Sequence, residues 1–314
     1  MKKHCIGIDI GGTTVKMGLF TTEGELLDKW EVLTRKEEGG RYILSDVAAS
    51  VKKVLADKGI GSDTVAGAGM GVPGPVMPDG SVEVCVNLGW RDMNPQQELS
   101  RLLDGLLVKS GNDANVAALG EMWQGGGKGY TDIVMVTLGT GVGGGVIIDE
   151  KIISGKHGLG GEIGHIHVRD EEWEHCNCGG VGCVEQIASA TGIAREAKRR
   201  LAVTDAPSSM RKYGDAVTAK DVIEEAKAGD AIALEVAETV GRYLGLMLAQ
   251  VAMTVDPEMF VIGGGVSKAG QFLIERIEKY YDHYSPISQN KAKIGLAKLG
   301  NDAGIYGAAR LVLS

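Results

Sequence analysis

Three observations predict an α/β fold for this sequence. Short apolar runs rich in β-branched residues alternate with stretches whose apolar residues recur every three or four positions, which is the pattern of strands alternating with helices. Glycine makes up 48 of the 314 residues, roughly twice the usual share of about 7%, and it clusters where predicted strands end. Hydrophobic residues make up 44% of the chain, which is enough for a sizeable core and excludes gross disorder.

The first part of the chain begins with three predicted strands. A β-branched run predicts a strand at residues 4–10, and the glycine turn after it leads into strands at 15–20 and 26–33. Residues 41–58 carry apolar side chains at helical spacing and predict a helix. Further predicted elements are strands at 65–72 and 106–109 and helices at 95–103 and 116–122.

The pattern then restarts. Strands are predicted at 133–138 and 146–148, separated by a glycine turn at 139–145. Aligning Asp9 with Thr137 superposes the two strand–turn–strand units, so we expect two similar half-domains. The remaining predicted elements are a helix at 230–254, a strand at 259–262, and helices at 267–281 and 303–313.

Charge and hydropathy exclude some functions. The net charge of −8 argues against a nucleic-acid backbone as the main partner. The longest apolar stretch, residues 244–255, is interrupted by Gln250, whereas a membrane span needs about 20 residues. No export signal is visible at the N-terminus. We therefore expect a cytoplasmic protein without nucleic-acid or membrane partners.

Two glycine turns have the composition of phosphate sites. Asp9 ends a strand before Gly11-Gly12-Thr13-Thr14, where glycines let backbone N–H groups approach a phosphate and Asp9 could hold Mg²⁺ through water. A plain β-hairpin is the alternative. Residues 139–144 match G-x-G-x-x-G, but a dinucleotide site needs a helix next, and a strand-like run follows. A second phosphate-binding hairpin is the better interpretation.

Asn112 and Asp113 lie between a predicted strand and a predicted helix. One of them would suit the helix N-cap. Alternatively, a carboxylate at a strand end could accept a hydroxyl proton during phosphoryl transfer.

Three of the five cysteines lie close together, at Cys176, Cys178 and Cys183, which is a poor disulfide framework and a good metal cluster. Thiolates prefer Zn²⁺, and a closed structural site needs four ligands. His165, His167 and His175 are candidates for the fourth, although His175 directly adjoins Cys176. Free buried thiols and a redox site are the weaker alternatives.

Two glutamates flank this cluster. Glu162 and Glu185 could hydrogen-bond adjacent sugar hydroxyls if the metal site fixed them, or they could be solvated surface residues.

Together, these motifs resemble the bacterial ROK family of sugar kinases and repressors. The resemblance runs almost end to end, and the ordered set with its Cys₃ signature is highly specific. The matching segments are residues 9–16, 71–76, 87–90, 112–115, 138–145, 161–165, 176–185 and 263–266.

The resemblance implies an actin-like, hexokinase-type ATPase fold with two α/β domains around a central cleft. The small domain would comprise residues 1–117, completed by the C-terminal helix 303–314, and the large domain, with the zinc site, residues 118–302. The implied activity is transfer of the ATP γ-phosphoryl group to the 6-hydroxyl of glucose, with ATP and Mg²⁺ and a structural Zn²⁺. Alternatives are a kinase for N-acetylmannosamine, fructose or mannose, polyphosphate as donor, and a non-catalytic sugar sensor. A repressor is disfavoured, because the phosphate motif begins at residue 9.

The resemblance also assigns roles to residues. Asp113 is the implied catalytic base, and the chain is expected to form a homodimer or homotetramer. The implied sugar-binding residues are Asn87, Asn112, Asp113, Glu162, His165 and Glu185. The implied zinc ligands are His165, Cys176, Cys178 and Cys183. The implied ATP-binding residues are Asp9, Gly11, Gly12, Thr13, Thr14, Lys16, Gly139, Thr140, Gly141, Gly263, Gly264 and Gly265.

Overall fold

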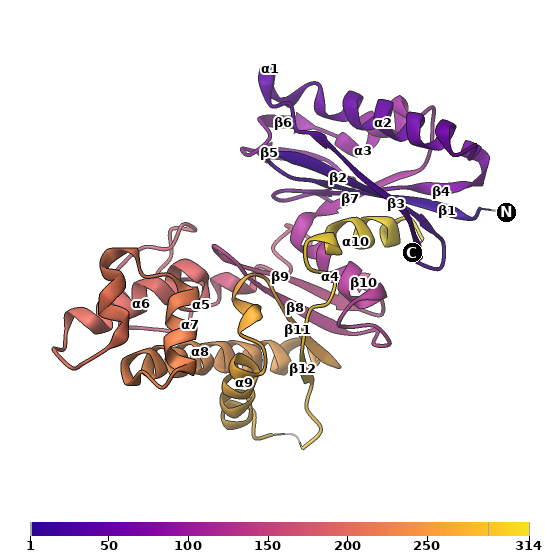
Figure 1. Cartoon of the computed structure of the whole chain (residues 1–314). Coiled ribbons are helices and arrows are strands. Elements are labelled where there is room, and N and C mark those ends of the chain that lie inside the picture. Colours follow the sequence, from indigo (N-terminus) through magenta and orange to yellow (C-terminus); the bar gives the residue numbers. More distant parts are fainter. Residues whose placement is uncertain (1, 288, 314) are drawn as a thin grey trace. The chain divides into compact units, whose positions relative to one another are not determined.

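A computed structural model describes residues 2–287 and 289–313 of the chain (Figure 1). The chain forms two compact units. The first comprises residues 1–133, 145–161 and 298–314, and the second comprises residues 134–144 and 162–297. The predicted α/β class is confirmed. Compactness alone does not decide where functional domains divide, so the predicted boundaries after residues 117 and 302 stay a prediction.

Two five-stranded sheets have the same strand order. The first runs β3-β2-β1-β4-β7 and the second β10-β9-β8-β11-β12. In each sheet, three strands that are consecutive in the chain lie side by side, and the last two strands join the sheet through crossover connections. This shared order agrees with the repeat that the sequence predicts. The strands are β1 (His4–Ile10), β2 (Thr14–Thr21), β3 (Leu26–Leu33), β4 (Val65–Val72), β7 (Val108–Asn112), β8 (Ile133–Leu138), β9 (Val142–Ile148), β10 (Lys151–Ile152), β11 (Met259–Gly263) and β12 (Lys293–Leu296), with β5 (Val82–Cys85) and β6 (Trp90–Met93) in a separate pair.

The first unit buries both faces of its sheet (Figure 1). Side chains alternate along β1, so that Ile6 and Ile8 pack in one core with α2 (Ile43–Asp57) and α3 (Pro95–Leu102). Cys5, on the opposite face, packs with α10 (Ala303–Leu311).

Helix α10 lies unusually close to the sheet. A Cβ atom on Gly7 would lie 1.8 Å from the Ile305 carbonyl oxygen, and one on Gly69 would lie 1.6 Å from that of Ala308. Only glycine permits such an approach of backbone to backbone. The same packing brings Gly304, near the start of α10, against Asp9 at the end of β1. The packing of the C-terminal helix therefore constrains the position of a predicted site residue.

The second unit is mostly helical around its part of the second sheet. Its longest helix is α8 (Ala231–Val255). Asp230 caps its N-terminus by accepting a hydrogen bond from the Ala233 N–H, and Asp256, which has a φ of 45°, caps its C-terminus. The other helices are α5 (Glu185–Ala188), α6 (Ala190–Ala202), α7 (Ala219–Lys227) and α9 (Gln271–Tyr284) here, and α1 (Glu37–Gly40) and α4 (Asp113–Gln124) in the first unit.

Several predicted boundaries are wrong. The strand expected at 106–109 is Val108–Asn112, and the following helix begins at Asp113 because Asn112 caps it. The second glycine turn ends at Gly141, since the later glycines belong to β9, where Gly145 packs closely on Ala118. The helix expected from residue 267 starts at Gln271, because Gly270 has a φ of 68° that interrupts it.

Some elements were not predicted. They include β5, β6, β12 and the helices α1, α5, α6 and α7. Among residues 2–287 and 289–313, no helix combines the length and apolar character that a membrane crossing requires.

Candidate active site

Parallel strands bring the predicted residues of the first unit to one edge of its sheet. Asp9 near the end of β1 pairs with Gly71 of β4, and Val72 pairs with Asn112 of β7. The carboxyl ends of these three strands therefore gather Asp9, Asn112 and Asp113. Ligands of open α/β sheets bind outside such carboxyl ends.

Asn112 caps helix α4 and thereby orients Asp113. Its side-chain oxygen accepts hydrogen bonds from the N–H groups of Ala114 and Asn115, at 3.0 and 3.1 Å. Its amide nitrogen donates to the Gly74 carbonyl and to Oδ1 of Asp113, both at 3.1 Å. The capping interpretation is thus correct for Asn112, and it leaves Asp113 as the first residue of the helix, half-buried.

The surroundings of the Asp9 carboxylate disfavour its ionised form. Burial raises its pKa from 3.8 to about 6, the Lys16 ammonium lowers the pKa, and the nearby Asp113 carboxylate raises it. Lys16 donates its own hydrogen bond to the Asn301 carbonyl, at 3.3 Å. A divalent cation next to Asp9 would stabilise its ionised form.

Hydrogen bonds within the first glycine turn and from Thr34, just after β3, hold the turn in place. The Gly11 N–H donates to the Thr14 carbonyl, and Thr34 donates its hydroxyl to the Gly11 carbonyl and its N–H to the Thr13 carbonyl. Gly12 and Thr13 are exposed. A Cβ on Gly12 would meet nothing within 4 Å, and its φ is not positive, so the fold itself does not require glycine there.

Asn87 lies exposed in the connection between β5 and β6. Burial raises the pKa of the neighbouring Cys85 thiol, and the Asp113 carboxylate contributes to that rise. This connection is therefore within electrostatic range of Asp113. The indole N–H of Trp90 anchors it by donating to the Gly40 carbonyl, at 3.2 Å.

In the second unit, the start of α6 holds the second glycine turn. The Ala190 N–H donates to the Gly139 carbonyl at 2.8 Å, and the Thr191 hydroxyl donates to the Thr140 carbonyl at 3.1 Å. Thr140 is exposed, Gly141 is half-buried, and a Cβ on Gly139 would meet nothing within 4 Å.

The third glycine segment, Gly263–Gly265, begins at the last residue of β11. Gly264 has a φ of 84°, and a Cβ there would lie 2.4 Å from the Leu138 carbonyl oxygen, so Gly263–Gly265 lies beside the end of β8. Gly265 has open space around it. It lines a pocket of about 470 Å³ whose walls include Ile223, Lys227 and Lys268.

The three cysteines converge with a single histidine. The ligand atoms of His165, Cys176, Cys178 and Cys183 all lie within 4.8 Å of one another. The Sγ atoms of Cys178 and Cys183 are 3.7 Å apart, and Nδ1 of His165 is 3.7 Å from Sγ of Cys176. Tetrahedral zinc with Zn–S bonds of about 2.3 Å needs sulfur atoms roughly 3.8 Å apart. The donor set therefore fits one zinc ion.

The other two candidate histidines are used elsewhere. His167 contacts the Val181 carbonyl and the Asp170 carboxylate, and His175 contacts the Gly179 carbonyl.

The thiols differ in acidity. Burial raises the pKa of Cys183 to about 12 and raises that of Cys176, whereas hydrogen bonding from the Gly180 backbone lowers that of Cys178. Since thiolates are the ligands, metal binding would release protons from the buried thiols.

Both flanking glutamates lie against this cluster. Glu185 accepts a hydrogen bond from the Val142 N–H, at 2.9 Å, and one from the Cys176 thiol, at 3.6 Å. An oxygen of Glu162 lies 3.8 Å from Nε2 of His165, although the glutamate is half exposed. Glu185 is thus fixed by the protein, while Glu162 keeps access to solvent.

Sequence reasoning missed the residues that brace these motifs. Thr34 and Thr191 support the glycine turns, and Gln186 joins the two ends of the cysteine loop. Only Gln186 carries a local signal, since it directly follows Glu185 in the cysteine motif.

Comparisons with known proteins find close likenesses along the whole chain. A model described as the ROK family matches residues 5–314. A glucokinase of Halalkalibacterium halodurans is 44% identical over 98% of this chain and 94% of its own. A ROK family glucokinase from Streptomyces griseus, solved with glucose and AMPPNP, is 34% identical with a TM-score of 0.73 over 98% of both chains. The ROK hexokinase of Thermus thermophilus is 30% identical with a TM-score of 0.81, over 98% of this chain and 96% of its own.

Proposed function

This chain belongs to the ROK family, and on that premise we propose that it is a glucokinase, which transfers the γ-phosphoryl group of ATP to the 6-hydroxyl of glucose. The similarity to glucokinases over nearly the full length supports an ATP-dependent sugar kinase. It also supports the hexokinase-type fold, with which the two mixed sheets agree.

The observation that carries the proposal is the pair of carboxylates at the carboxyl edge of the first sheet. Asp113, at the start of α4, accepts the proton of the sugar hydroxyl as that oxygen meets the γ-phosphoryl group. Asp9, which is half-buried and has a raised pKa, would hold Mg²⁺ through water. Because the transition state is loose, the position of Asp113 matters more than its basicity. The Asn112 cap provides that position.

Besides Asp113, five side chains are the proposed sugar ligands. They are Asn87, Asn112, Glu162, His165 and Glu185, which would hydrogen-bond the sugar hydroxyls. Zinc held by His165 and the three cysteines supplies a structural cross-link and takes no part in the chemistry. Glu185 supports this assignment, because the Val142 N–H already orients its carboxylate.

The glycine segments supply the nucleotide contacts. Gly12, Gly139 and Gly265 each have open space where a side chain could stand and no positive φ. Phosphate or ribose approaching the backbone explains why glycine occupies such positions. The proposed contacts are Gly11, Gly12, Thr13, Thr14 and Lys16, then Gly139, Thr140 and Gly141, with Gly263, Gly264 and Gly265 near the adenosine.

A coupled assay of ADP release tests the proposal. We expect the fastest turnover on glucose when glucose, mannose, fructose, N-acetylglucosamine and N-acetylmannosamine are compared with ATP and Mg²⁺. Asp113→Ala should lower kcat by about 10²–10⁴-fold while ATP still binds in a calorimetric titration. The matched control is Asp46→Ala, which removes a first-turn carboxylate of α2 that pairs with Arg35 on the surface.

Each other outcome is informative. Wild-type turnover by Asp113→Ala would remove Asp113 from the mechanism. A preference for another sugar would keep the mechanism and change the substrate. No turnover on any sugar would contradict the proposal and lead to trials of polyphosphate as donor or of a non-catalytic sensor.

Three further features belong to this proposal. The protein acts in the cytoplasm, where it supplies glycolysis, and it assembles as a homodimer or homotetramer. Its small domain comprises residues 1–117 and 303–314 and its large domain residues 118–302. Light scattering of the purified protein measures the assembly state.

A further inference from the structure

One buried amide joins both ends of the cysteine loop, which we define as residues 174–183. Gln186 is only 5% exposed. Its side-chain nitrogen donates to the Glu174 carbonyl at 2.9 Å, and its side-chain oxygen accepts from the Cys183 N–H at 3.1 Å. Both polar ends of this side chain are therefore bound to the backbone at the two limits of the loop.

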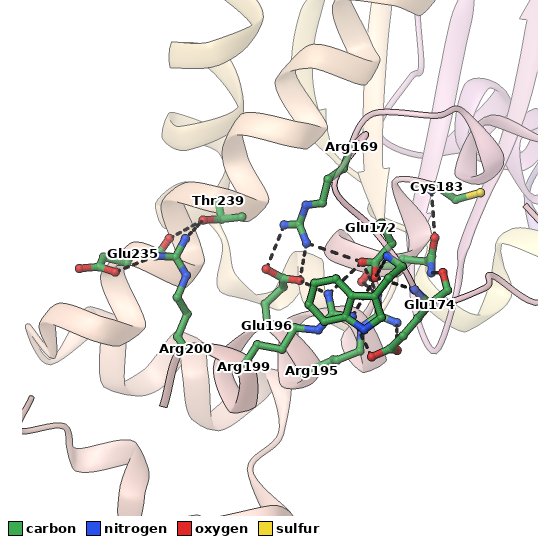
Figure 2. Close-up of polar contacts among 12 residues, drawn as sticks. Arg169, Glu172, Glu174, Cys183, Arg195, Glu196, Arg199, Arg200, Glu235 and Thr239 are labelled. Carbon is green, nitrogen blue, oxygen red and sulfur yellow. Dashed lines mark hydrogen bonds and ion pairs between the residues drawn. The ribbon is translucent and has the colours of Figure 1, made fainter. Parts of the chain in front are cut away.

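Two arginine side chains of α6 contact Gln186 and the residues around the start of the loop (Figure 2). Arg195 donates to the Gln186 carbonyl and, at 2.8 Å, to the Glu174 carboxylate. Arg199 donates from two nitrogens to the Glu172 carboxylate, at 2.8 and 2.9 Å. The Glu172 side chain is fully buried. The residues that precede the loop are thus held against α6.

We propose that Gln186 is a positioning residue that holds the cysteine loop in its metal-binding shape before the metal arrives. The amide fixes Cys183 directly and fixes Cys176 through Glu174, two residues before it. Inside the loop, the Cys176 N–H donates to the Gly180 carbonyl and the Gly179 N–H donates to the Cys176 carbonyl, both at 2.8 Å. With its ends closed by Gln186, the loop needs little further ordering when the metal binds.

The same amide bears on sugar binding, a consequence that rests on the proposed function. Glu185 is the neighbour of Gln186 in α5, and its carboxylate accepts a hydrogen bond from the Val142 N–H. If the ends of the loop separate, Cys183 shifts, and Glu185, two residues after it, moves away from the Val142 N–H that orients its carboxylate. Gln186 therefore acts on the sugar through Glu185 and on the metal through the two cysteines.

Gln186→Met tests the proposal, since methionine has a similar length and no polar end. The first measurement is zinc release from the loaded protein to a chromogenic chelator. The second is hydrogen exchange in the metal-free protein, read at the Cys183 amide. We expect release at least about tenfold faster, in the range of supporting residues around metal sites, and faster exchange confined to residues 174–183. The glucose KM should rise while the ATP KM and kcat stay close to wild type.

Gln250→Met is the matched control. Gln250 is a half-buried amide of α8 whose side-chain oxygen has no hydrogen-bond partner in the described residues. It should leave metal release and loop exchange unchanged, so a change in both variants would indicate a general loss of stability and would overturn the proposal. Wild-type metal release and loop exchange in folded Gln186→Met would also overturn it.

Two further points keep the test decisive. If Gln186→Met does not fold, Gln186→Glu replaces it, because a carboxylate cannot donate to the Glu174 carbonyl. Wild-type metal release from Gln186→Glu would overturn the proposal. Metal release and exchange need no turnover, so they are informative even if the protein proves not to phosphorylate glucose. Conversely, normal phosphorylation with unchanged release would refute only the role of Gln186.

Discussion

The first unit places Asp9 by packing backbone against backbone, whereas the second unit places its cysteines and Glu185 by hydrogen bonds of polar side chains. Around Asp9, α10 lies on the sheet at distances that admit no Cβ on Gly7 or Gly69. Around the cysteine loop, Gln186, Arg195 and the buried Glu172 provide the contacts. Steric packing resists any added volume but is indifferent to pH. A polar network tolerates volume changes but responds to charge and acid.

The carboxylates of Asp9 and Glu172 show the same contrast in their pKa values. Burial raises the pKa of Asp9 to about 6. Hydrogen bonds from the Arg199 guanidinium hold the pKa of Glu172 down at about 2. Without a sufficient partner, burial favours the neutral acid, whereas guanidinium partners favour the anion. Asp9 is therefore suited to bind a cation that arrives with the substrate, and Glu172 is suited to a permanent structural role.

Gly69→Ala should have the largest effect on stability. The added Cβ would lie 1.6 Å from the Ala308 carbonyl oxygen, an atom of the α10 backbone that cannot turn aside. We expect a loss of about 3 kcal/mol or more in the free energy of unfolding, measured by denaturant titration. Gly71→Ala in the same strand is the control, because its nearest contacts, starting at 3.6 Å, are ordinary. Equal stability of the two variants would refute steric placement of α10.

Glu172→Gln should have an intermediate effect on the second unit. It removes a fully buried carboxylate from Arg199 and Arg195, at a cost of about 2 kcal/mol. The control is Glu235→Gln, because Glu235 is 59% exposed where it pairs with Arg200 (Figure 2), and such surface pairs contribute at most about 1 kcal/mol.

The contribution of the Glu172 carboxylate to stability should depend on pH. The pKa of Glu172 is lower in the folded protein than its ordinary 4.5, so its contribution is present above pH 4.5 and is lost as the pH falls toward about 2. Thermal melts between pH 6 and 2.5 should therefore show a smaller acid loss for Glu172→Gln than for wild type. Parallel curves would contradict this role of Glu172.

The sequence predicts the local features of this molecule and misses those that depend on distant partners. The glycine turns and the cysteine cluster were predicted because each motif is contained in a few consecutive residues. The requirement for glycine at position 69 was not predicted, because it comes from the close approach of the Ala308 backbone, which lies far along the chain. In the sequence, Glu172 looks like an ordinary surface glutamate, because its partner Arg199 is brought to it only by the packing of α6. Strands β5 and β6, with four residues each, are too short to show a period.

Gly12→Ala should have the smallest effect on stability and a clear effect on function. Nothing lies within 4 Å of the added Cβ and the φ of Gly12 is not positive, so the fold accepts alanine. Lower entropy of the unfolded chain could even raise stability by about 0.5 kcal/mol. A methyl group there would hold a phosphate away from the turn's N–H groups. We therefore expect a higher KM for ATP with the glucose KM unchanged, measured in the coupled assay.

Gly265→Ala is the matched variant in the second unit, where open space also surrounds the glycine. Both variants should keep the wild-type melting temperature or exceed it, in contrast to Gly69→Ala. If either leaves the KM for ATP unaltered, the open space at that glycine has no connection with the nucleotide. If either unfolds the protein, the distinction between glycines required by packing and glycines required by a ligand fails at that position.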